Sequence, residues 1–324
     1  MPHFMSDVAL VAGVVLLLVV LSALLSPFET LGWWAGWDRR WPGPVAPPDA
    51  PSPPPSKETR SDTRYYLVYL SGIGSFGPKL LIEKELNFLD LLQRRLPGAV
   101  IVRDIYPYSP TNDPLPGRRY LAPFWRLIHR LMEASGVTLL VLIISVRNLF
   151  QVAISADRRY GPLFNFGVAR EIALALVRHG YRLGDRQPVV LMGLSGAAQI
   201  AIGATPVLRR LLRAPVWLVS IGGVLTDDPG ILVVEHVLQV SGSRDPVQHV
   251  GAWLYPGRWP IFKRSAWNRA LARGKLSVVD VGPVRHMAAG DYFSRSSRLA
   301  TGESHVEKTV AVIGDYVQSL APQA

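Results

Sequence analysis

The sequence contains no cysteine, which excludes disulfide bonds, thiolate nucleophiles and cysteine-ligated metal sites. Covalent catalysis would therefore need an oxygen or nitrogen nucleophile. The sequence also lacks an H-E-x-x-H motif, a P-loop and a cluster of carboxylates, so we expect no metal ion and no cofactor. We find no internal repeat.

Acidic residues are few relative to basic ones. The 24 Asp and Glu against 35 Lys and Arg give a net charge of +11, which favours anionic partners such as phospholipid headgroups, nucleic acid or acidic substrates. Charge alone does not choose among these. The 49% hydrophobic content favours a membrane-associated protein.

The run Val8 to Leu25 has no charged residue, and at 1.5 Å per residue it would span about 27 Å of hydrocarbon. No Lys or Arg precedes it, so we expect an uncleaved anchor rather than a signal peptide. Four tryptophans follow at headgroup distance, at Trp33, Trp34, Trp37 and Trp41. Arg39 and Arg40 lie on the same side, which predicts a single-pass membrane protein whose main domain is cytoplasmic.

Three regions follow from this pattern. Residues 1–40 form the anchor with its aromatic segment, and residues 41–63 are a proline-rich linker that favours a stiff, extended spacer. Residues 64–324 form the main domain, in which 106–165 are a possible cap over the site.

In the main domain, strand patterns alternate with helical ones, which predicts an α/β fold with a mostly parallel sheet and helices on both faces. The expected strands are Tyr65–Leu70, Ala99–Val102, Pro188–Leu194, Val216–Ile221, Val233–Val240 and Leu276–Val281. Helices are expected at Lys79–Arg95, Phe124–Met132 and Phe166–His179. The apolar run Val137–Val146 is too short to span a bilayer, so we expect a buried strand there and keep a membrane-dipping segment as the alternative.

The stretch Pro188 to Ile202 predicts a strand, a tight turn with Ser195 at its apex, and a helix. Small residues flank the serine, including Gly193 and Gly196, as a close approach of strand and helix requires. Ala197 stands where the G-x-S-x-G pattern has its last glycine. A serine on such a turn exposes its hydroxyl as a nucleophile, while the alternative is an ordinary helix capped by serine.

A serine nucleophile needs a base, and the base is usually a histidine held by a carboxylate. Asp245 and His286 each follow a predicted strand, in the chain order Ser, Asp, His. Asp227 and Asp228 follow an earlier strand and are the alternative acids. The other histidines fit core or solvated roles better; they are His3, His129, His179, His236, His249 and His305.

With these motifs, the chain from Arg64 onward resembles the α/β-hydrolase superfamily. The resemblance implies that Ser195 is the nucleophile, His286 the general base and Asp245 the orienting acid. The segment Ser71-Gly-Ile-Gly74 falls where the family carries its oxyanion loop, with Ser71 in place of the common histidine. The amides of Ile73 and Gly196 would then form the oxyanion hole.

The segment Gly72 to Gly77 also matches G-x-G-x-x-G after a strand, and Asp104 follows the next strand. That pattern is typical of a dinucleotide-binding oxidoreductase. Between the acid and the base, aromatic residues interleave with cations over Trp253 to Arg269, which suits anionic lipid or nucleic-acid bases, or is simply a solvated basic face.

The sequence therefore predicts a membrane-tethered serine hydrolase that cleaves a carboxylic ester of lipid-like character through an acyl-serine intermediate. Its partners would be a lipid or small acyl ester and the membrane, with no nucleic acid. The alternatives are a catalytically silent hydrolase-fold protein that binds a partner or lipid at the membrane, and the dinucleotide-binding oxidoreductase.

Overall fold

The computed structural model describes residues 65–78, 81–117, 121–135, 138–287 and 289–320, with 13–14, 16–22 and single positions at 25, 28, 31 and 35. The described residues do not include His3, most residues at the two ends of the proposed anchor, the four tryptophans near residue 40 or the proline-rich linker. The predicted domain boundaries within 1–64 therefore stay predictions.

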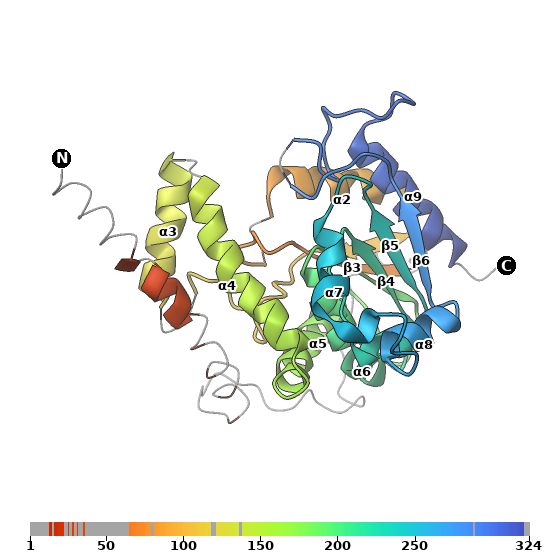
Figure 1. Cartoon of the computed structure of the whole chain (residues 1–324), viewed down its shortest axis with the longest axis horizontal. Helices are drawn as coiled ribbons and strands as arrows, with labels where there is room; N and C mark the ends of the chain where they lie inside the picture. The colour runs from red at the N-terminus through yellow and green to blue at the C-terminus, as the bar shows by residue number, and fades with distance from the viewer. Residues whose placement is uncertain are drawn as a thin grey trace.

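Within the described residues, six parallel strands form one sheet in the order β2-β1-β3-β4-β5-β6 (Figure 1). They are β1 Tyr65–Leu70, β2 Ala99–Val102, β3 Val189–Leu194, β4 Val216–Ile221, β5 Val237–Ser241 and β6 Leu276–Asp280. The chain leaves β1 towards β2 on one side and returns to β3 on the other. Such a switch point opens a crevice at the carboxyl ends of the strands, where α/β proteins place their sites. The α/β prediction is confirmed, and this sheet is consistent with the α/β-hydrolase fold.

The described helices follow or connect these strands. The α-helices are α2 Glu83–Arg95, α3 Ala122–Ser135, α4 Thr138–Ala156, α5 Gly161–Arg178, α6 Ala197–Leu212, α7 Val250–Leu254, α8 Ala266–Ala272 and α9 His305–Ser319. Short 3-10 turns are η2 Pro229–Leu232, η3 Val247–His249 and η4 Pro256–Arg258.

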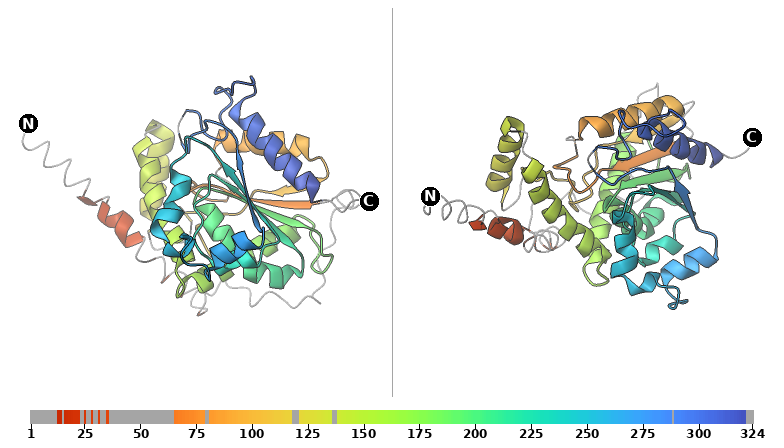
Figure 2. Two further views of the ribbon diagram at one scale, coloured as in Figure 1. Left: turned by 45° about the vertical axis from the view of Figure 1, so that its right-hand side comes forward. Right: turned by 45° about the horizontal axis from the view of Figure 1, so that its top comes forward.

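Strand β1 is buried on both faces of the sheet, which explains why it reads as a continuous apolar run. Tyr66, Val68 and Leu70 pack in the same core as α5 and α6, whereas Leu67 and Tyr69 pack with α2 and α9. Figure 2 shows the two helical layers on opposite faces of the sheet. Burial on both sides fixes the register of the central strands, and with it the loops at their carboxyl ends.

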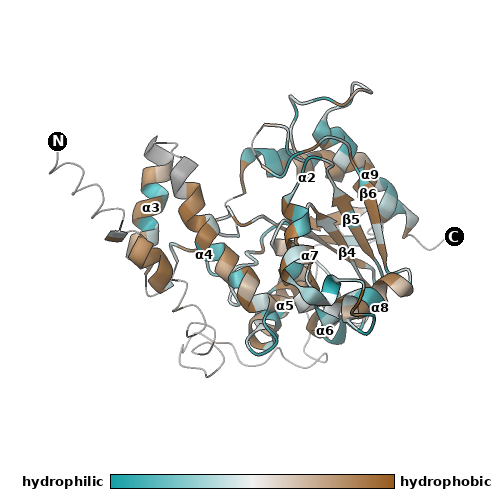
Figure 3. Cartoon of the chain, viewed as in Figure 1, coloured by the Kyte–Doolittle hydropathy of each residue, from teal (hydrophilic) through white to brown (hydrophobic). Residues whose placement is uncertain are grey.

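The predicted strand over Val137–Val146 is wrong, because its described residues, 138–146, belong to α4. Helices α3 and α4 lie beside the sheet (Figure 1), and the ribbon of α4 is largely hydrophobic (Figure 3). Ile144 and Val152 of α4 are buried towards the domain, while Leu142 and Leu149 are exposed on its other side. A helix that is apolar on both faces gives a continuous hydrophobic run without a helical period, so length and composition mimic a buried strand.

Several predicted boundaries also shift, most of all at the starts of α2, α5 and β5. Helix α2 begins at Glu83 instead of Lys79, and α5 begins at Gly161 instead of Phe166, with a proline in its first turn that suits a helix start. Strand β5 begins only at Val237, because η2 and a turn occupy the preceding residues. His236 therefore precedes β5 instead of lying within it.

Part of the proposed anchor packs on α3. Residues 16–22 are helical, Val19 is buried, and the Oγ of Ser22 accepts a hydrogen bond of 3.1 Å from Trp125 Nε1. None of the helices formed by described residues combines the length and apolar composition needed to cross a bilayer.

Candidate active site

Ser195 sits between β3 and α6 in the left-handed region of backbone space, with φ at +56°. A non-glycine residue there stores roughly 1–3 kcal/mol of strain and is usually held by its surroundings. Its amide donates to Ile221 O at 3.0 Å, which fixes the turn. A Cβ on Gly193 would lie 2.5 Å from the Cα of Ala198, so strand and helix meet too closely for any other residue. This is the strained turn that the flanking small residues predicted.

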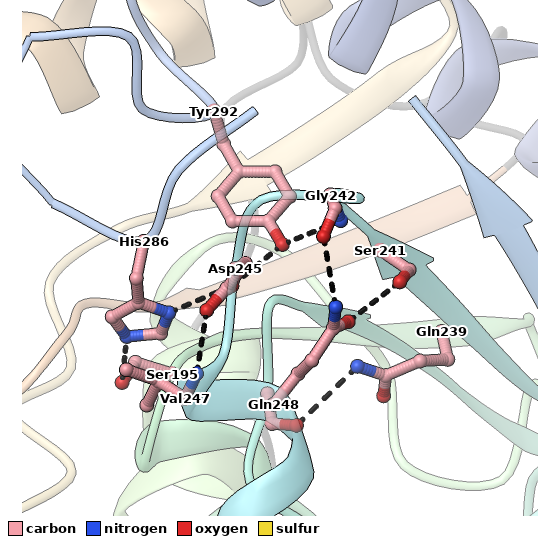
Figure 4. Close-up of polar contacts among 10 residues, drawn as sticks. Ser195, Gln239, Ser241, Gly242, Asp245, Val247, Gln248, His286 and Tyr292 are labelled. Carbon is pink, nitrogen blue, oxygen red and sulfur yellow. Dashed lines mark hydrogen bonds and ion pairs between the residues drawn. The ribbon is translucent and has the colours of Figure 1, made fainter. Parts of the chain in front are cut away.

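The structure brings Ser195, His286 and Asp245 into one hydrogen-bonded chain (Figure 4). Ser195 Oγ lies 2.7 Å from His286 Nε2, and His286 Nδ1 lies 2.9 Å from Asp245 Oδ2. Each residue comes from the end of a different strand, β3, β6 and β5 respectively. The carboxylate is fully buried, whereas the imidazole remains partly open to solvent. A base thus contacts the serine hydroxyl, and an anion orients the base.

Asp245 has further partners that the sequence did not reveal. The Tyr292 hydroxyl donates to Asp245 Oδ2 at 2.7 Å, and the Val247 amide donates to Oδ1 at 2.9 Å. Burial raises the pKa of Asp245, but the hydrogen bonds from His286, Tyr292 and Val247 outweigh it, so the net pKa is lowered. Burial and the nearby Asp245 charge raise the pKa of Tyr292, which keeps its hydroxyl a donor. Asp245 is therefore held as an anion facing the imidazole.

The turn that carries Asp245 is closed by Gln248. Its Nε2 donates to Gly242 O at 2.9 Å, and its Oε1 accepts from the Ser241 hydroxyl at 2.6 Å (Figure 4). The Gly242 amide donates to Tyr292 OH at 2.9 Å, so the tyrosine joins the turn to its carboxylate. These contacts fix Asp245 relative to β5, and the tyrosine shares the Oδ2 atom that His286 contacts.

The predicted oxyanion residues lie next to each other. A Cβ on Gly196 would fall 3.2 Å from Ile73 Cγ2, which places the loop after β1 against the residue after Ser195. Within the described residues, neither the Ile73 amide nor the Gly196 amide donates a hydrogen bond to a protein acceptor. Gly196 is buried and Ile73 is half-buried, and amides in such places are usually paired, so two free ones beside a serine hydroxyl suit an anionic oxygen of a substrate.

Asn148 of α4 holds that loop from behind, and sequence reasoning missed it. Its Nδ2 donates to Ile73 O and to Ser75 O, both at 2.8 Å, while its Oδ1 accepts from Tyr106 OH at 2.9 Å. Asn148 is fully buried. A further hydrogen bond of 3.0 Å runs from Tyr108 OH to Ser71 O. The position of the Ile73 amide thus depends on a polar contact between α4 and the loop.

The alternative acids lie elsewhere. Asp227 pairs with Arg158 at 3.2 Å, and the Asp228 side chain accepts from the Gly230 amide at 2.7 Å and from Gln199. His286 Nδ1 contacts Asp245 instead, so the geometry favours Asp245 as the residue that orients the imidazole.

The remaining described histidines have structural partners. His179 contacts Asp104 at 3.1 Å, His236 contacts Tyr316 OH at 3.0 Å, and His305 lies 3.0 Å from Gly290 O. The ring of His129 packs on Phe76, and that of His249 packs near Trp253. Among the described residues, no three His, Asp or Glu side chains are arranged to hold a metal ion.

The structure does not favour a dinucleotide at the Gly72 to Gly77 loop. A phosphate-binding loop should lead directly into a helix, yet α2 begins only at Glu83. Asp104 is already paired with Arg178 and His179, and the hydrogen bond from His179 lowers its pKa to about 2 against the effect of burial. The carboxylate expected to hold a ribose is therefore engaged in an ion-pair cluster.

Comparison with protein-family models gives no match, and comparison with curated proteins gives none either. Among solved structures, the chain is similar to a hyperthermophilic esterase from the archaeon Pyrobaculum calidifontis. The identity is 12%, the TM-score is 0.39, and the similarity covers 80% of this chain and 77% of that one. Similarity this distant leaves the function open, so the residues of this chain must decide it.

Proposed function

We propose that this protein is a serine hydrolase that cleaves a carboxylic ester through an acyl-Ser195 intermediate. One observation carries the proposal: Ser195, His286 and Asp245 form a continuous hydrogen-bonded chain beside two unpaired amides. A base in contact with a hydroxyl, and donors ready for a developing oxyanion, are the two groups that acyl transfer requires.

The steps follow from these contacts. His286 Nε2 takes the proton of Ser195 as the Oγ attacks the ester carbonyl, and Asp245 stabilises the imidazolium through Nδ1. The carbonyl oxygen becomes an anion and accepts hydrogen bonds from the amides of Ile73 and Gly196. The imidazolium then protonates the leaving alcohol, which leaves an acyl ester on Ser195. Water, deprotonated by the same imidazole, releases the carboxylic acid and restores the serine.

We also propose, from the sequence, that the substrate is lipid-like and that the protein is tethered to a membrane. The uncharged Val8 to Leu25 run and the exposed apolar residues of α4 support them. Carbonate extraction of native membranes, followed by protease protection, tests the tether and its cytoplasmic orientation. Release of the full chain by carbonate would contradict the tether without affecting the chemistry proposed for Ser195.

The function is tested by initial rates on p-nitrophenyl esters of increasing acyl length. We expect Asp245→Asn to reduce kcat by about 10⁴-fold, because the amide cannot hold the imidazole in its working tautomer. The matched control is Asp227→Asn, which removes an equally sized charge from the alternative acid and should leave kcat within a few-fold. Equal losses in the two variants would contradict the assignment of Asp245.

Two other outcomes separate the alternatives. If the folded wild-type chain turns over none of the esters and Ser195 does not react, the catalytically silent binding protein is favoured. Fluorescence titration with nicotinamide cofactors tests the oxidoreductase, and saturable binding that is lost on Gly72→Ala would support it.

A further inference from the structure

Residues 253–264, between Asp245 and α8, form a surface segment that we call the 253–264 loop. Large apolar side chains stand out from it into solvent, with Ile261 75% exposed and Trp253 66% exposed. The other exposed apolar members are Leu254, Trp259 and Phe262. Single exposed hydrophobic residues are ordinary, but five within one short segment suggest a surface that another apolar phase covers.

The loop is held in place by groups beneath it. Asn268 Nδ2 donates to Trp259 O at 2.8 Å and to Phe262 O at 3.0 Å. Arg258 donates to Leu225 O at 2.8 Å, and its guanidinium lies 3.8 Å above the ring of Trp267. The backbone that carries Ile261 is thus anchored on both sides. Because the anchoring groups contact the backbone of the loop from the side of the domain, the side chain of Ile261 is held in solvent.

A pocket of about 580 Å³ opens at this tip. Arg158, Lys263 and Arg264 supply three positive charges to its lining, and Ile261 and Phe262 supply apolar surface. Asp227 offsets one of the charges through its ion pair with Arg158. The remaining charge is positive, so an anion is the ligand that the pocket suits.

We propose that the 253–264 loop binds the surface of an anionic phospholipid bilayer. Headgroup phosphates would pair with Arg158, Lys263 and Arg264, while Ile261 and Phe262 enter the acyl boundary. Tryptophan and basic residues next to each other are the composition that settles at an anionic interface. The net charge of +11 attracts the chain to such a surface.

The loop is less suited to nucleic acid. Its most exposed apolar residue is aliphatic, and the rings of Trp259 and Phe262 lie against each other at 6.2 Å with a 44° tilt. Bases stack on open aromatic faces, which an isoleucine tip does not offer. The inference does not depend on the chemistry of Ser195, so it stands or falls independently of the proposed hydrolase activity.

The absence of cysteine allows a site-specific test on the full chain. Ile261→Cys, labelled with an environment-sensitive fluorophore, should shift its emission to the blue on vesicles containing phosphatidylglycerol. Nitroxide lipids in the same vesicles should quench it. Val278→Cys, an exposed apolar position on β6, is the matched control and should show neither effect. Because the readout is local, attachment through another part of the chain does not produce it.

Charge is tested in the same labelled chain. Replacing Lys263 and Arg264 with Gln should raise the lipid concentration that gives half of the emission shift about 30-fold. Each cation near an anionic surface contributes about 1 kcal/mol to binding, and 1.4 kcal/mol is tenfold in affinity. The control neutralises Arg182 and Arg210, which are exposed at the other end of the sheet, and should leave the signal nearly unchanged.

Four results would overturn the proposal. They are an equal response on pure phosphatidylcholine vesicles, a response to inorganic phosphate alone, a response to an oligonucleotide in place of vesicles, and no response on phosphatidylglycerol. Circular dichroism of each labelled variant shows whether it is folded. A folded Ile261→Cys chain with unchanged emission on anionic vesicles contradicts the proposal directly.

Discussion

Asn148→Asp, compared with a matched control, tests whether the position of the oxyanion loop affects catalysis apart from any loss of domain stability. The change keeps the size of the side chain and the acceptor that Tyr106 OH contacts. It removes both N–H donors, so the carbonyls of Ile73 and Ser75 lose their 2.8 Å partners and face a carboxylate oxygen instead. We therefore expect the loop to move away from α4, and the Ile73 amide to move with it.

The magnitude follows from the contacts that are lost. Leaving a buried carbonyl without its donor costs about 1–3 kcal/mol, so two carbonyls predict a stability loss of about 2–6 kcal/mol. Misplacing one oxyanion donor lowers kcat by about 10²–10³-fold. The effect should fall on kcat with little change in KM, since the amide contacts an oxyanion that forms only in the transition state.

Asn165→Asp is a matched control. Asn165 is also buried, and it likewise joins two elements, through a hydrogen bond of 3.0 Å from its Nδ2 to Ser155 O and one of 2.7 Å from the Ser155 hydroxyl. Its side-chain amide bonds to Ser155 of α4 and not to the oxyanion loop. The assay is ester turnover at a temperature where denaturant titration shows both variants fully folded. If both substitutions reduce kcat equally, or Asn148→Asp changes only KM, the reasoning about the loop is refuted.

Three further predictions concern the surroundings of the site. Tyr292→Phe should lower kcat/KM about tenfold, because Asp245 loses one hydrogen bond of roughly 1.5 kcal/mol; unchanged rates would show that the other donors suffice. Glu85 is buried, which raises its pKa to about 7 from 4.5, so the folded state keeps a proton that the unfolded state loses as pH rises from 4.5 to 7. Stability should therefore fall across that window by about 3 kcal/mol, and Glu85→Gln should abolish the fall in urea titrations at pH 5 and 8; a parallel pH dependence in both proteins would disprove this. Gly193→Ala should prevent the turn at Ser195 from forming, since its Cβ would meet the backbone of Ala198 at 2.5 Å, and soluble, active Gly193→Ala protein would contradict that contact.

The strands were predictable because both faces of the sheet are buried. Tyr65–Leu70 and Ala99–Val102 are continuous apolar runs between turn residues, and the structure confirms both to the residue. The strand-turn-helix at Ser195 was equally visible, because Gly193 is required by its contact with Ala198 in the same motif. In each case the signal is local in the sequence.

Helix α4 and its partners show where that reasoning ends. Arg147 and Asn148 looked like the polar boundary of a short apolar strand, whereas in the structure they lie mid-helix and are buried. Arg147 donates to Tyr108 O at 2.8 Å, and Asn148 reaches Ile73. These partners are separated by tens of residues, and no periodicity links them. Tyr292 escaped notice for the same reason, because its relation to Asp245 arises only when the ends of β5 and β6 meet.

The most direct test of the central claim is labelling of the full chain with a fluorophosphonate, with the adduct located by peptide mass spectrometry. A phosphonate reacts only with a serine that a base has activated and whose oxyanion is stabilised. We predict a single adduct on Ser195 that is absent in Ser195→Ala. An unlabelled, folded wild-type chain, or labelling that persists in Ser195→Ala, would contradict the account.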